Sequence, residues 1–318
     1  MSIFITGIES FLGKFLVKSL IKRKFVFSGI DLLAKSDFAK KYDINDHNLK
    51  NVIPDDCKSI IHLAAISSSK DFKTDVQKAY ATNINGTINI VKAAIEKNVK
   101  QIIFASTEWV YGEDKSGRKN ESSHIYFENL GSEYALSKAI CENILKYYCS
   151  LNNINCTILR FGITYGPRQN KNNWSAVESI LYDLFLGNTK ITIGSKKTAR
   201  KFIYVEDVSE GIIASMDMKG VKILNLAGDK LITLNEIIET GCKILNIKCK
   251  ILEKDSNNFN VRDVDNNLVK SLTEWTPKYD FYSGVKNTIQ SFKKLDKNIK
   301  LSTYKTPGSS RMDHAAND

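Results

Sequence analysis

The chain has 318 residues, of which 42% are hydrophobic and 25% are charged, and this composition excludes intrinsic disorder. Its length predicts one large two-lobed unit or two domains, and its 17 glycines and 4 prolines exclude a collagen-like or linker-like chain. The net charge of +11 comes mostly from scattered lysines, which are typical of a solvated surface rather than a nucleic-acid interface and suit an anionic substrate such as a nucleotide.

Strands and helices alternate along the first half of the chain. Short, continuous apolar runs predict strands at residues 2–6, 25–30, 59–63, 101–105 and 156–160. Apolar residues at helical spacing predict helices at residues 11–24, 82–97 and 133–149. Because the strand runs do not alternate with polar residues, they indicate a parallel sheet covered on both faces. The predicted fold class is therefore α/β, with a Rossmann-type doubly wound parallel sheet.

The pattern changes after Pro167. It predicts a polar loop at 170–174, a helix at 177–186 and a strand at 190–193. Further apolar segments predict a return to the main sheet at 202–216 and 222–226, and then a smaller α+β segment at 228–292. We therefore expect a dinucleotide-binding domain, a smaller C-terminal lobe and a disordered tail. Their predicted boundaries are 1–166 with 201–226, 167–200 with 227–296, and 297–318.

Cysteine usage points to a reducing compartment, and histidine usage points to a protein without a metal site. The six cysteines contain no C-x-x-C pair and are expected to be reduced and mostly buried. The four histidines form no cluster with ligand spacing, so no metal is expected. No apolar run approaches the roughly 20 residues of a membrane span, and the N-terminus does not resemble a signal peptide. These features predict a soluble, cytoplasmic protein.

A glycine-spaced loop follows the first predicted strand. In T-G-I-E-S-F-L-G at 6–13, Gly7 permits a tight turn and Gly13 permits close packing of helix on strand, so the helix N-terminus can bind a pyrophosphate. Ser10 replaces the middle glycine of the usual pattern, and its hydroxyl could donate to a phosphate. The predicted cofactor contacts in this loop are Gly7, Ser10, Phe11, Leu12 and Gly13.

Asp31 closes the second predicted strand, where a carboxylate accepts hydrogen bonds from the hydroxyls of an adenosine ribose. The same charge repels a 2′-phosphate, which favours NAD over NADP. The alternative is that Asp31 merely ends the strand. Together with the glycine loop, Asp31 predicts NAD as the cofactor.

A tyrosine and a lysine lie one helical turn apart in Y-A-L-S-K at 134–138. On one helix face, the Lys138 ammonium would lower the pKa of the Tyr134 phenol and make it a usable acid–base group. Such a pair is frequent by chance and can be an exposed helix pair. Ser106 and Thr107 give it weight, because they follow the fourth strand at the edge where ligands of α/β sheets bind. Thr107 could then bond the oxygen that Tyr134 protonates, beside a nicotinamide.

The chain resembles the NAD-dependent nucleotide-sugar epimerases and dehydratases, which are extended short-chain dehydrogenases/reductases, from about residue 3 to residue 289. The resemblance rests on nine motifs in order. These are T-G-I-E-S-F-L-G at 6–13, D-I-N-D at 43–46, H-L-A-A at 62–65, N-I-N-G-T at 83–87, S-T-E-W-V-Y-G at 106–112, Y-A-L-S-K at 134–138, L-R-F-G-I-T-Y-G-P-R at 159–168, R-K-F-I-Y-V-E-D-V at 200–208 and W-T-P-K-Y at 275–279.

The resemblance implies roles for further residues. On the cofactor side it implies contacts to adenine, ribose, pyrophosphate and the nicotinamide end from Asp43, Ile44, Leu63, Ala64, Ala65, Asn83, Ser106, Tyr134 and Lys138. On the side of a nucleotide-diphosphate sugar it implies contacts from Thr107, Glu108, Arg200 and Arg262, the two arginines gripping the diphosphate. The implied catalytic residues are Thr107, Tyr134 and Lys138, and His62 is expected to be structural.

Residues after Thr107 differ from two branches of this family. In the 4,6-dehydratases an Asp-Glu pair follows the catalytic threonine, and the decarboxylases keep a glutamate at the second position. Here Glu108 and Trp109 follow, and an indole cannot take a proton. The expected reaction is therefore a 4-epimerisation, in which tightly held NAD oxidises C4 reversibly and the hydride returns to the other face.

Other interpretations stay open. One is a 4-keto-sugar reductase or a dehydratase-related enzyme of the same family, and another is a noncatalytic NAD-binding sensor. The expected partners are a nucleotide-diphosphate sugar and a second copy of the chain, not nucleic acid or a membrane. The resemblance implies a homodimer in which helices 82–97 and 133–149 pack against their symmetry mates as a four-helix bundle, and a twofold pairing is also the commonest oligomer.

Overall fold

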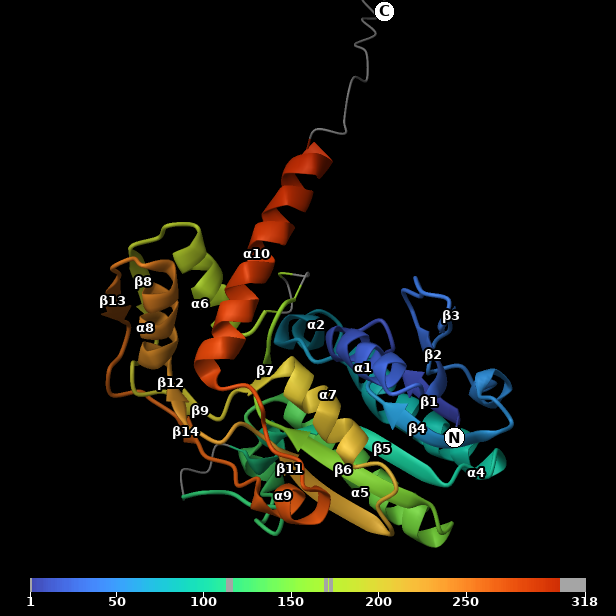
Figure 1. Cartoon of the computed structure of the whole chain (residues 1–318). Coiled ribbons are helices and arrows are strands. Elements are labelled where there is room, and N and C mark those ends of the chain that lie inside the picture. Colours follow the sequence, from blue (N-terminus) through green and yellow to red (C-terminus); the bar gives the residue numbers. More distant parts are fainter. Residues whose placement is uncertain (1, 113–116, 169–170, 172–173, 304–318) are drawn as a thin grey trace, which may run out of the picture.

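A sheet of seven parallel strands forms the centre of the computed structural model, which describes residues 2–112, 117–168, 171 and 174–303 (Figure 1). The strand order is β11-β6-β5-β4-β1-β2-β3, and each neighbouring pair is parallel. The bounds are Ser2–Thr6 (β1), Val26–Asp31 (β2), Ala39–Lys41 (β3), Cys57–His62 (β4), Gln101–Thr107 (β5), Asn155–Phe161 (β6) and Val221–Leu226 (β11). The predicted doubly wound α/β fold is confirmed, and the order reverses between β1 and β4, where such sheets bind ligands.

Helices cover both faces of this sheet. On one face, α1 (Phe11–Lys22) packs beside α7 (Val205–Ala214), and on the other α4 (Gly86–Glu96) packs beside α5 (Glu133–Leu151). Strand β1 shows why its run is continuously apolar. Ile3 and Ile5 face the core under α1 and α7, whereas Phe4 between them faces the core under α4 and α5. Each such burial contributes about 1.5–3 kcal/mol.

Short elements connect these strands and helices. They are the 3₁₀ turns η1 (Leu49–Val52), η3 (Glu108–Tyr111) and η4 (Phe127–Asn129), the helices α2 (Ser69–Thr74) and α3 (Val76–Tyr80), and one π turn, η2 (Ala81–Asn85). The predicted helix at 82–97 therefore begins with the π turn, and its α-helical part starts at Gly86.

A third core lies outside the sheet, under α6 (Ala176–Phe185), α8 (Leu234–Leu245) and α10 (Phe281–Thr303). Capping boxes at Ser175 and Thr233 start α6 and α8. Small sheets, separate from the main sheet, accompany this core. Two of them have two strands each, β7 (Thr164–Tyr165) with β10 (Ile203–Tyr204) and β8 (Lys190–Ile193) with β13 (Lys250–Glu253). The third has the order β12 (Ile232–Thr233), β9 (Ala199–Arg200) and β14 (Val261–Arg262). Helix α9 (Asn267–Thr273) follows β14 in the chain.

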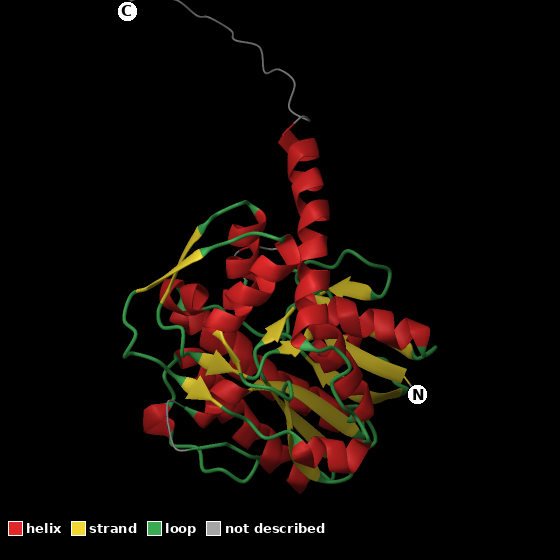
Figure 2. Ribbon diagram, turned by 60° about the vertical axis from the view of Figure 1, so that its left-hand side comes forward, coloured by secondary structure: helices red, strands yellow, loops and turns green. Residues whose placement is uncertain are grey.

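Two predictions about the second half of the chain are wrong in part. Residues 202–216 do not add a strand to the main sheet, because Ile203–Tyr204 pairs with β7 and the rest forms α7 on the sheet's face. Of the predicted tail, residues 297–303 belong to α10, which extends beyond the rest of the molecule in both views (Figures 1 and 2). No glycine or proline lies between Gly284 and the end of α10 at Thr303, so this stretch holds no helix breaker.

Other predictions fall outside the description or stay untested. Residues 304–318 of the predicted tail and most of the predicted loop at 170–174 lie outside the described residues, and the domain boundaries stay a prediction. All six cysteines are free, and four of them are buried. Within the described ranges, no helix is long and apolar enough to cross a bilayer.

Candidate active site

The loop between β1 and α1 needs glycine at two positions. Gly7 has φ +70°, and a Cβ there would lie 2.8 Å from the Ala64 backbone nitrogen. At Gly13 a Cβ would lie 2.4 Å from the Ile8 carbonyl oxygen. Gly7 therefore allows the turn and the approach of the segment after β4, and Gly13 lets α1 pack closely on its own loop.

Ser10 caps helix α1. Its hydroxyl oxygen accepts a hydrogen bond from the Gly13 backbone N–H at 3.0 Å, and its extended backbone needs no glycine. The hydroxyl hydrogen stays available to donate to a phosphate oxygen. Phe11 and Leu12 are the first residues of α1 and are partly exposed at the positive end of the helix dipole.

Asp31 is fixed at the end of β2. Its two carboxylate oxygens accept the backbone N–H of Glu9 and of Leu33, each at 3.0 Å. Glu9 in turn accepts the backbone N–H of Lys35 at 3.2 Å and of Ser36 at 2.8 Å. The glycine loop and the segment after β2 are thus joined in both directions, and the Asp31 oxygens keep lone pairs for ribose hydroxyls. The role of Glu9 has no motif in the sequence that would have predicted it.

The segment after β4 lies against the glycine loop. Leu63, Ala64 and Ala65 are partly exposed there, and the Ala64 backbone N–H donates to the Thr6 hydroxyl at 3.2 Å. Asn83 is buried behind it, where it accepts the backbone N–H of Ile66 at 2.8 Å and donates to the Ser137 hydroxyl at 2.9 Å. Its amide is therefore placed to brace the segment against α5.

Two residues after β3 differ in burial. Asp43 is exposed and accepts the Asn45 backbone N–H at 2.9 Å. Ile44 is buried, and a Cβ at Gly86 would lie only 2.5 Å from its Cδ1 atom. The Ile44 side chain thus packs into the protein beside the start of α4.

His62 closes β4 in a buried hydrogen-bond chain. Its Nδ1 lies 2.7 Å from the Thr6 hydroxyl and its Nε2 lies 3.1 Å from the Thr87 hydroxyl. Burial and the nearby Lys138 lower the pKa of His62 to about 3, so it stays neutral. This geometry agrees with the structural role expected for it.

The predicted catalytic residues come together where β5 ends and α5 begins. Tyr134 and Lys138 lie in the first two turns of α5, and Thr107 ends β5. The Tyr134 phenol lies close enough to the Thr107 hydroxyl for the hydroxyl to lower its pKa. The Lys138 ammonium is buried, donates to the Ala105 carbonyl at 2.7 Å and lies 4.5 Å above the Phe104 ring.

The pKa values at this site are set mainly by burial. Burial raises the pKa of Tyr134 to about 12, although the nearby Thr107 hydroxyl has the opposite effect. Burial also lowers the pKa of Lys138 to about 8, against the opposing effect of Glu142. The expected lowering of the Tyr134 pKa by Lys138 is therefore not found here, because the ammonium is directed at Ala105 and Phe104.

A buried ion pair that we did not predict lies directly behind this site. Glu142, one turn after Lys138, accepts from Arg160 Nε at 3.0 Å and from a terminal Arg160 nitrogen at 2.7 Å. The Ser106 hydroxyl donates to the same carboxylate at 2.6 Å, so it is directed away from the face where a cofactor contact was expected. The sequence signal that could have predicted this ion pair is Arg160, a charged residue at the end of the predicted buried strand 156–160.

Arg200 and Arg262 are brought together although far apart in sequence. They are register partners in the parallel strands β9 and β14. Arg200 donates to the carbonyls of Ala199 at 2.8 Å and Asn260 at 2.7 Å. Arg262 is 4% exposed, lies 4.6 Å from the Trp109 ring and pairs with buried Glu108 at 3.6 Å.

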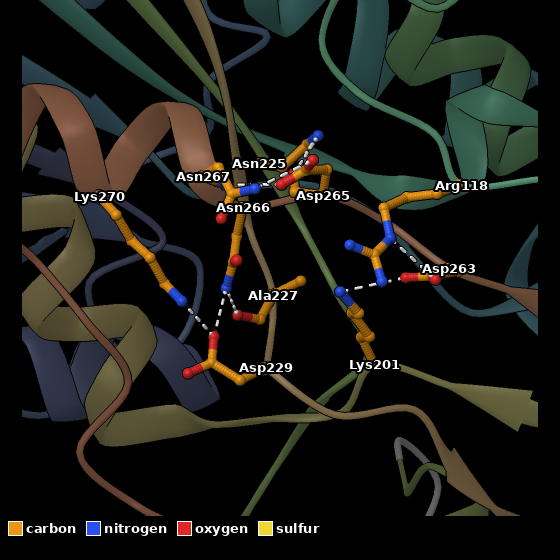
Figure 3. A network of polar contacts seen from close by, with 10 residues as sticks. All are labelled: Arg118, Lys201, Asn225, Ala227, Asp229, Asp263, Asp265, Asn266, Asn267 and Lys270. Atoms are coloured by element: carbon orange, nitrogen blue, oxygen red, sulfur yellow. Dashed lines mark hydrogen bonds and ion pairs between the residues drawn. The ribbon is translucent and has the colours of Figure 1, made fainter.

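A polar network fixes the strand that carries Arg262. The Asp263 carboxylate pairs with both Arg118 and Lys201, each at 3.0 Å, and Figure 3 shows the two cations reaching it. Farther along, Asn266 donates to the Ala227 carbonyl at 2.8 Å and to Asp229 at 2.9 Å. These bonds tie β14 and α9 to the end of β11.

The groups that the glycine loop and β2 present to a ligand fit a dinucleotide. The two crowded glycines leave the N-terminus of α1 open to a pyrophosphate, and backbone bonds hold Asp31 at the end of β2, where a ribose contact is expected. Within the described ranges, no group of three His, Cys, Asp or Glu residues is placed to hold a metal ion.

Comparisons with known proteins agree with this geometry. The model of the NAD dependent epimerase/dehydratase family matches residues 3–227. The chain is 27% identical to a UDP-N-acetyl-alpha-D-glucosaminuronate decarboxylase of Bacillus cytotoxicus and 28% identical to a putative UDP-glucose 4-epimerase of Methanocaldococcus jannaschii, and each match covers 92% of this chain and 98% of the relative. The solved UDP-glucose 4-epimerase of Thermotoga maritima with UDP-glucose has a TM-score of 0.82, with 23% identity over 92% of this chain and 99% of that one.

Proposed function

The chain belongs to the NAD-dependent epimerase/dehydratase family, so NAD is its cofactor, and we propose that it is a nucleotide-sugar 4-epimerase. Relatives of similar identity include both a decarboxylase and a putative 4-epimerase, so overall similarity does not choose between reactions. The choice between these reactions therefore rests on the residues around Thr107.

Trp109 is the observation that supports 4-epimerisation. It stands where the dehydratases and decarboxylases that the chain resembles keep a glutamate, and its indole has no proton-accepting group. The ring lies 4.6 Å from the Arg262 guanidinium, a cation–π contact that gives Trp109 a binding role instead. Glu108 is buried against Arg262, at 3.6 Å from it. A 4-epimerase needs neither a second acid nor a second base beside Thr107.

The proposed proton transfer uses residues of β5 and α5. When bound, NAD supplies the acceptor and donor of the hydride. As the phenolate, Tyr134 takes the proton of the C4 hydroxyl and becomes a phenol, and it gives that proton back after the keto sugar has rotated; Thr107 holds the same oxygen through its hydroxyl. Lys138, with a pKa of about 8, is mostly protonated at neutral pH, and its ammonium would stabilise the phenolate once it turns from the Ala105 carbonyl towards Tyr134.

Arginines of the smaller lobe are proposed to hold the diphosphate. Arg200 and Arg262 are register partners, so their guanidinium groups start from neighbouring positions on two paired strands. Guanidinium groups bind phosphate oxygens through two parallel hydrogen bonds. Asp31, Ser10 and the glycine loop serve the cofactor at the opposite end of the site.

A homodimer is also part of the proposal. On α5, Tyr147 and Leu151 are 65% and 67% exposed, and exposed apolar side chains on a helix are typical of a protein interface. Pairing of α4 and α5 with their symmetry mates would cover them. Light scattering at micromolar concentration should give twice the mass of one 35.9 kDa chain, and the mass of a single chain would contradict the dimer.

The reaction is tested with a panel of UDP-, GDP-, CDP- and dTDP-sugars, read by NMR. A 4-epimerase inverts C4 without releasing a keto sugar, whereas a 4-keto-6-deoxy product in quantity would contradict the proposal. The absorbance spectrum of the purified protein separates the alternatives. Near-stoichiometric retained cofactor favours the epimerase, empty protein favours a 4-keto reductase, and retained cofactor without any turnover favours a sensor.

A further inference from the structure

Glu108 is a buried acid that the proposed proton transfer does not use. Its side chain is fully buried, and neither carboxylate oxygen has a hydrogen-bond partner in the part of the chain that the structure describes. Arg262 forms an ion pair with one of these oxygens at 3.6 Å. A carboxylate without hydrogen bonds in such a place is costly unless a cation stays nearby.

Among the residues that the structure describes, two arginines face Glu108 from the packed elements. Arg262 comes from β14 and Arg200 from β9, and both act on the carboxylate. On the side of α5, Lys138 is bonded to the Ala105 carbonyl and Glu142 to Arg160. Arg262 is further held by the Gly112 carbonyl at 3.4 Å and by the Trp109 ring.

A bound diphosphate changes the charges around Glu108. It would add two negative charges at the arginines that face the buried carboxylate, and like charges close together disfavour the ionised form. A proton on Glu108 removes this repulsion, which is strong because the carboxylate lies away from water.

We propose that Glu108 takes up a proton when the diphosphate of a nucleotide sugar engages Arg200 and Arg262, so that pH controls substrate affinity through this residue. The inference rests on the proposed binding role of the two arginines, but not on the reaction that follows. Burial already raises the pKa of Glu108 to about 7, against the opposing effect of Arg262 and Arg200. A diphosphate that shares their charge raises it further. Above about pH 7, binding therefore requires a proton, and affinity falls by up to about tenfold per pH unit.

Calorimetry on the protein with its NAD measures this proton directly. UDP-, dTDP-, GDP- and CDP-glucose are titrated near pH 8 in buffers of different ionisation enthalpy. Their diphosphate diesters do not titrate near neutral pH, so the dependence of the heat on buffer counts protons taken up by the protein. The expected uptake approaches one proton per bound ligand in the wild type, and Glu108→Gln should bind without uptake.

A matched control and the possible outcomes make the test decisive. Glu121 is also a partly buried glutamate with a pKa raised by burial, but it accepts the Asn225 backbone N–H instead of facing the arginine pair. Glu121→Gln should keep the full proton uptake. Wild-type binding without uptake, equal uptake by Glu108→Gln, or no binding of any probe would each overturn the inference. Uptake without C4 inversion would instead remove the proposed 4-epimerase activity and leave the inference standing.

Discussion

Replacing Glu142 by glutamine should destabilise the protein by about 3–5 kcal/mol, the usual effect of removing one partner of a buried ion pair. The magnitude follows from the contacts. Both side chains are almost fully buried, the pair makes two hydrogen bonds of 3.0 and 2.7 Å, and the Ser106 hydroxyl adds a third of 2.6 Å. An amide cannot neutralise the Arg160 guanidinium, which stays buried beneath the site.

Thermal and urea unfolding would measure the loss. Since about 1 kcal/mol shifts Tm by roughly 2–4 °C in chains of this order of length, Glu142→Gln should lower Tm by about 6–20 °C. The double variant Glu142→Leu with Arg160→Met removes both charges and should be more stable than either single variant. A loss below about 1 kcal/mol in Glu142→Gln, or a double variant whose loss equals the sum of the single losses, would refute the reasoning.

Three further substitutions address binding and pH. Asp31→Asn should weaken the binding of NAD by about 1.5–3 kcal/mol, the value of a hydrogen bond to a charged group, and the binding of NADP by less. Calorimetry with both cofactors checks this, and an unchanged preference for NAD would contradict it. Arg200→Ala should weaken UDP-glucose by about 1.5–3 kcal/mol and leave NAD binding unchanged, whereas equal loss of both ligands would indicate misfolding. Because the lowered pKa of Lys138 is about 8, kcat at saturating substrate should fall as pH rises through about 8 and the ammonium is lost. The same fall in the pH profile of Lys138→Met would exclude Lys138 as its source.

The main sheet could be predicted because its strands are buried on both faces. Runs such as Ile3 to Ile5 need apolar residues at each position, and this leaves a strong signal in the sequence. Strands of two residues leave no such signal in the sequence. The strands β9, β12 and β14 exist only because residues far apart in the chain pair, and Ala199–Arg200 alone is indistinguishable from a loop.

The site was predictable where a motif is local. Tyr134 and Lys138 share one helix, and Gly7 and Gly13 share one loop, so their spacing carries the geometry. The ion pair of Glu142 and Arg160, by contrast, joins a helix to a strand, and its residues give no local spacing to read. The direction of the Lys138 ammonium could also not be predicted from the sequence, because it depends on where the Ala105 carbonyl lies.

The rate of C4 inversion by Tyr134→Phe, followed by NMR with the nucleotide sugar that the wild type converts, tests the central claim most directly. The variant lacks one hydroxyl, so it should fold, retain NAD and bind the sugar, yet lose about 10²–10⁴-fold in turnover or more. Tyr148→Phe, a matched change on the same helix, should keep wild-type turnover. Turnover by Tyr134→Phe close to that of the wild type would contradict the assignment of the C4 proton to this phenol.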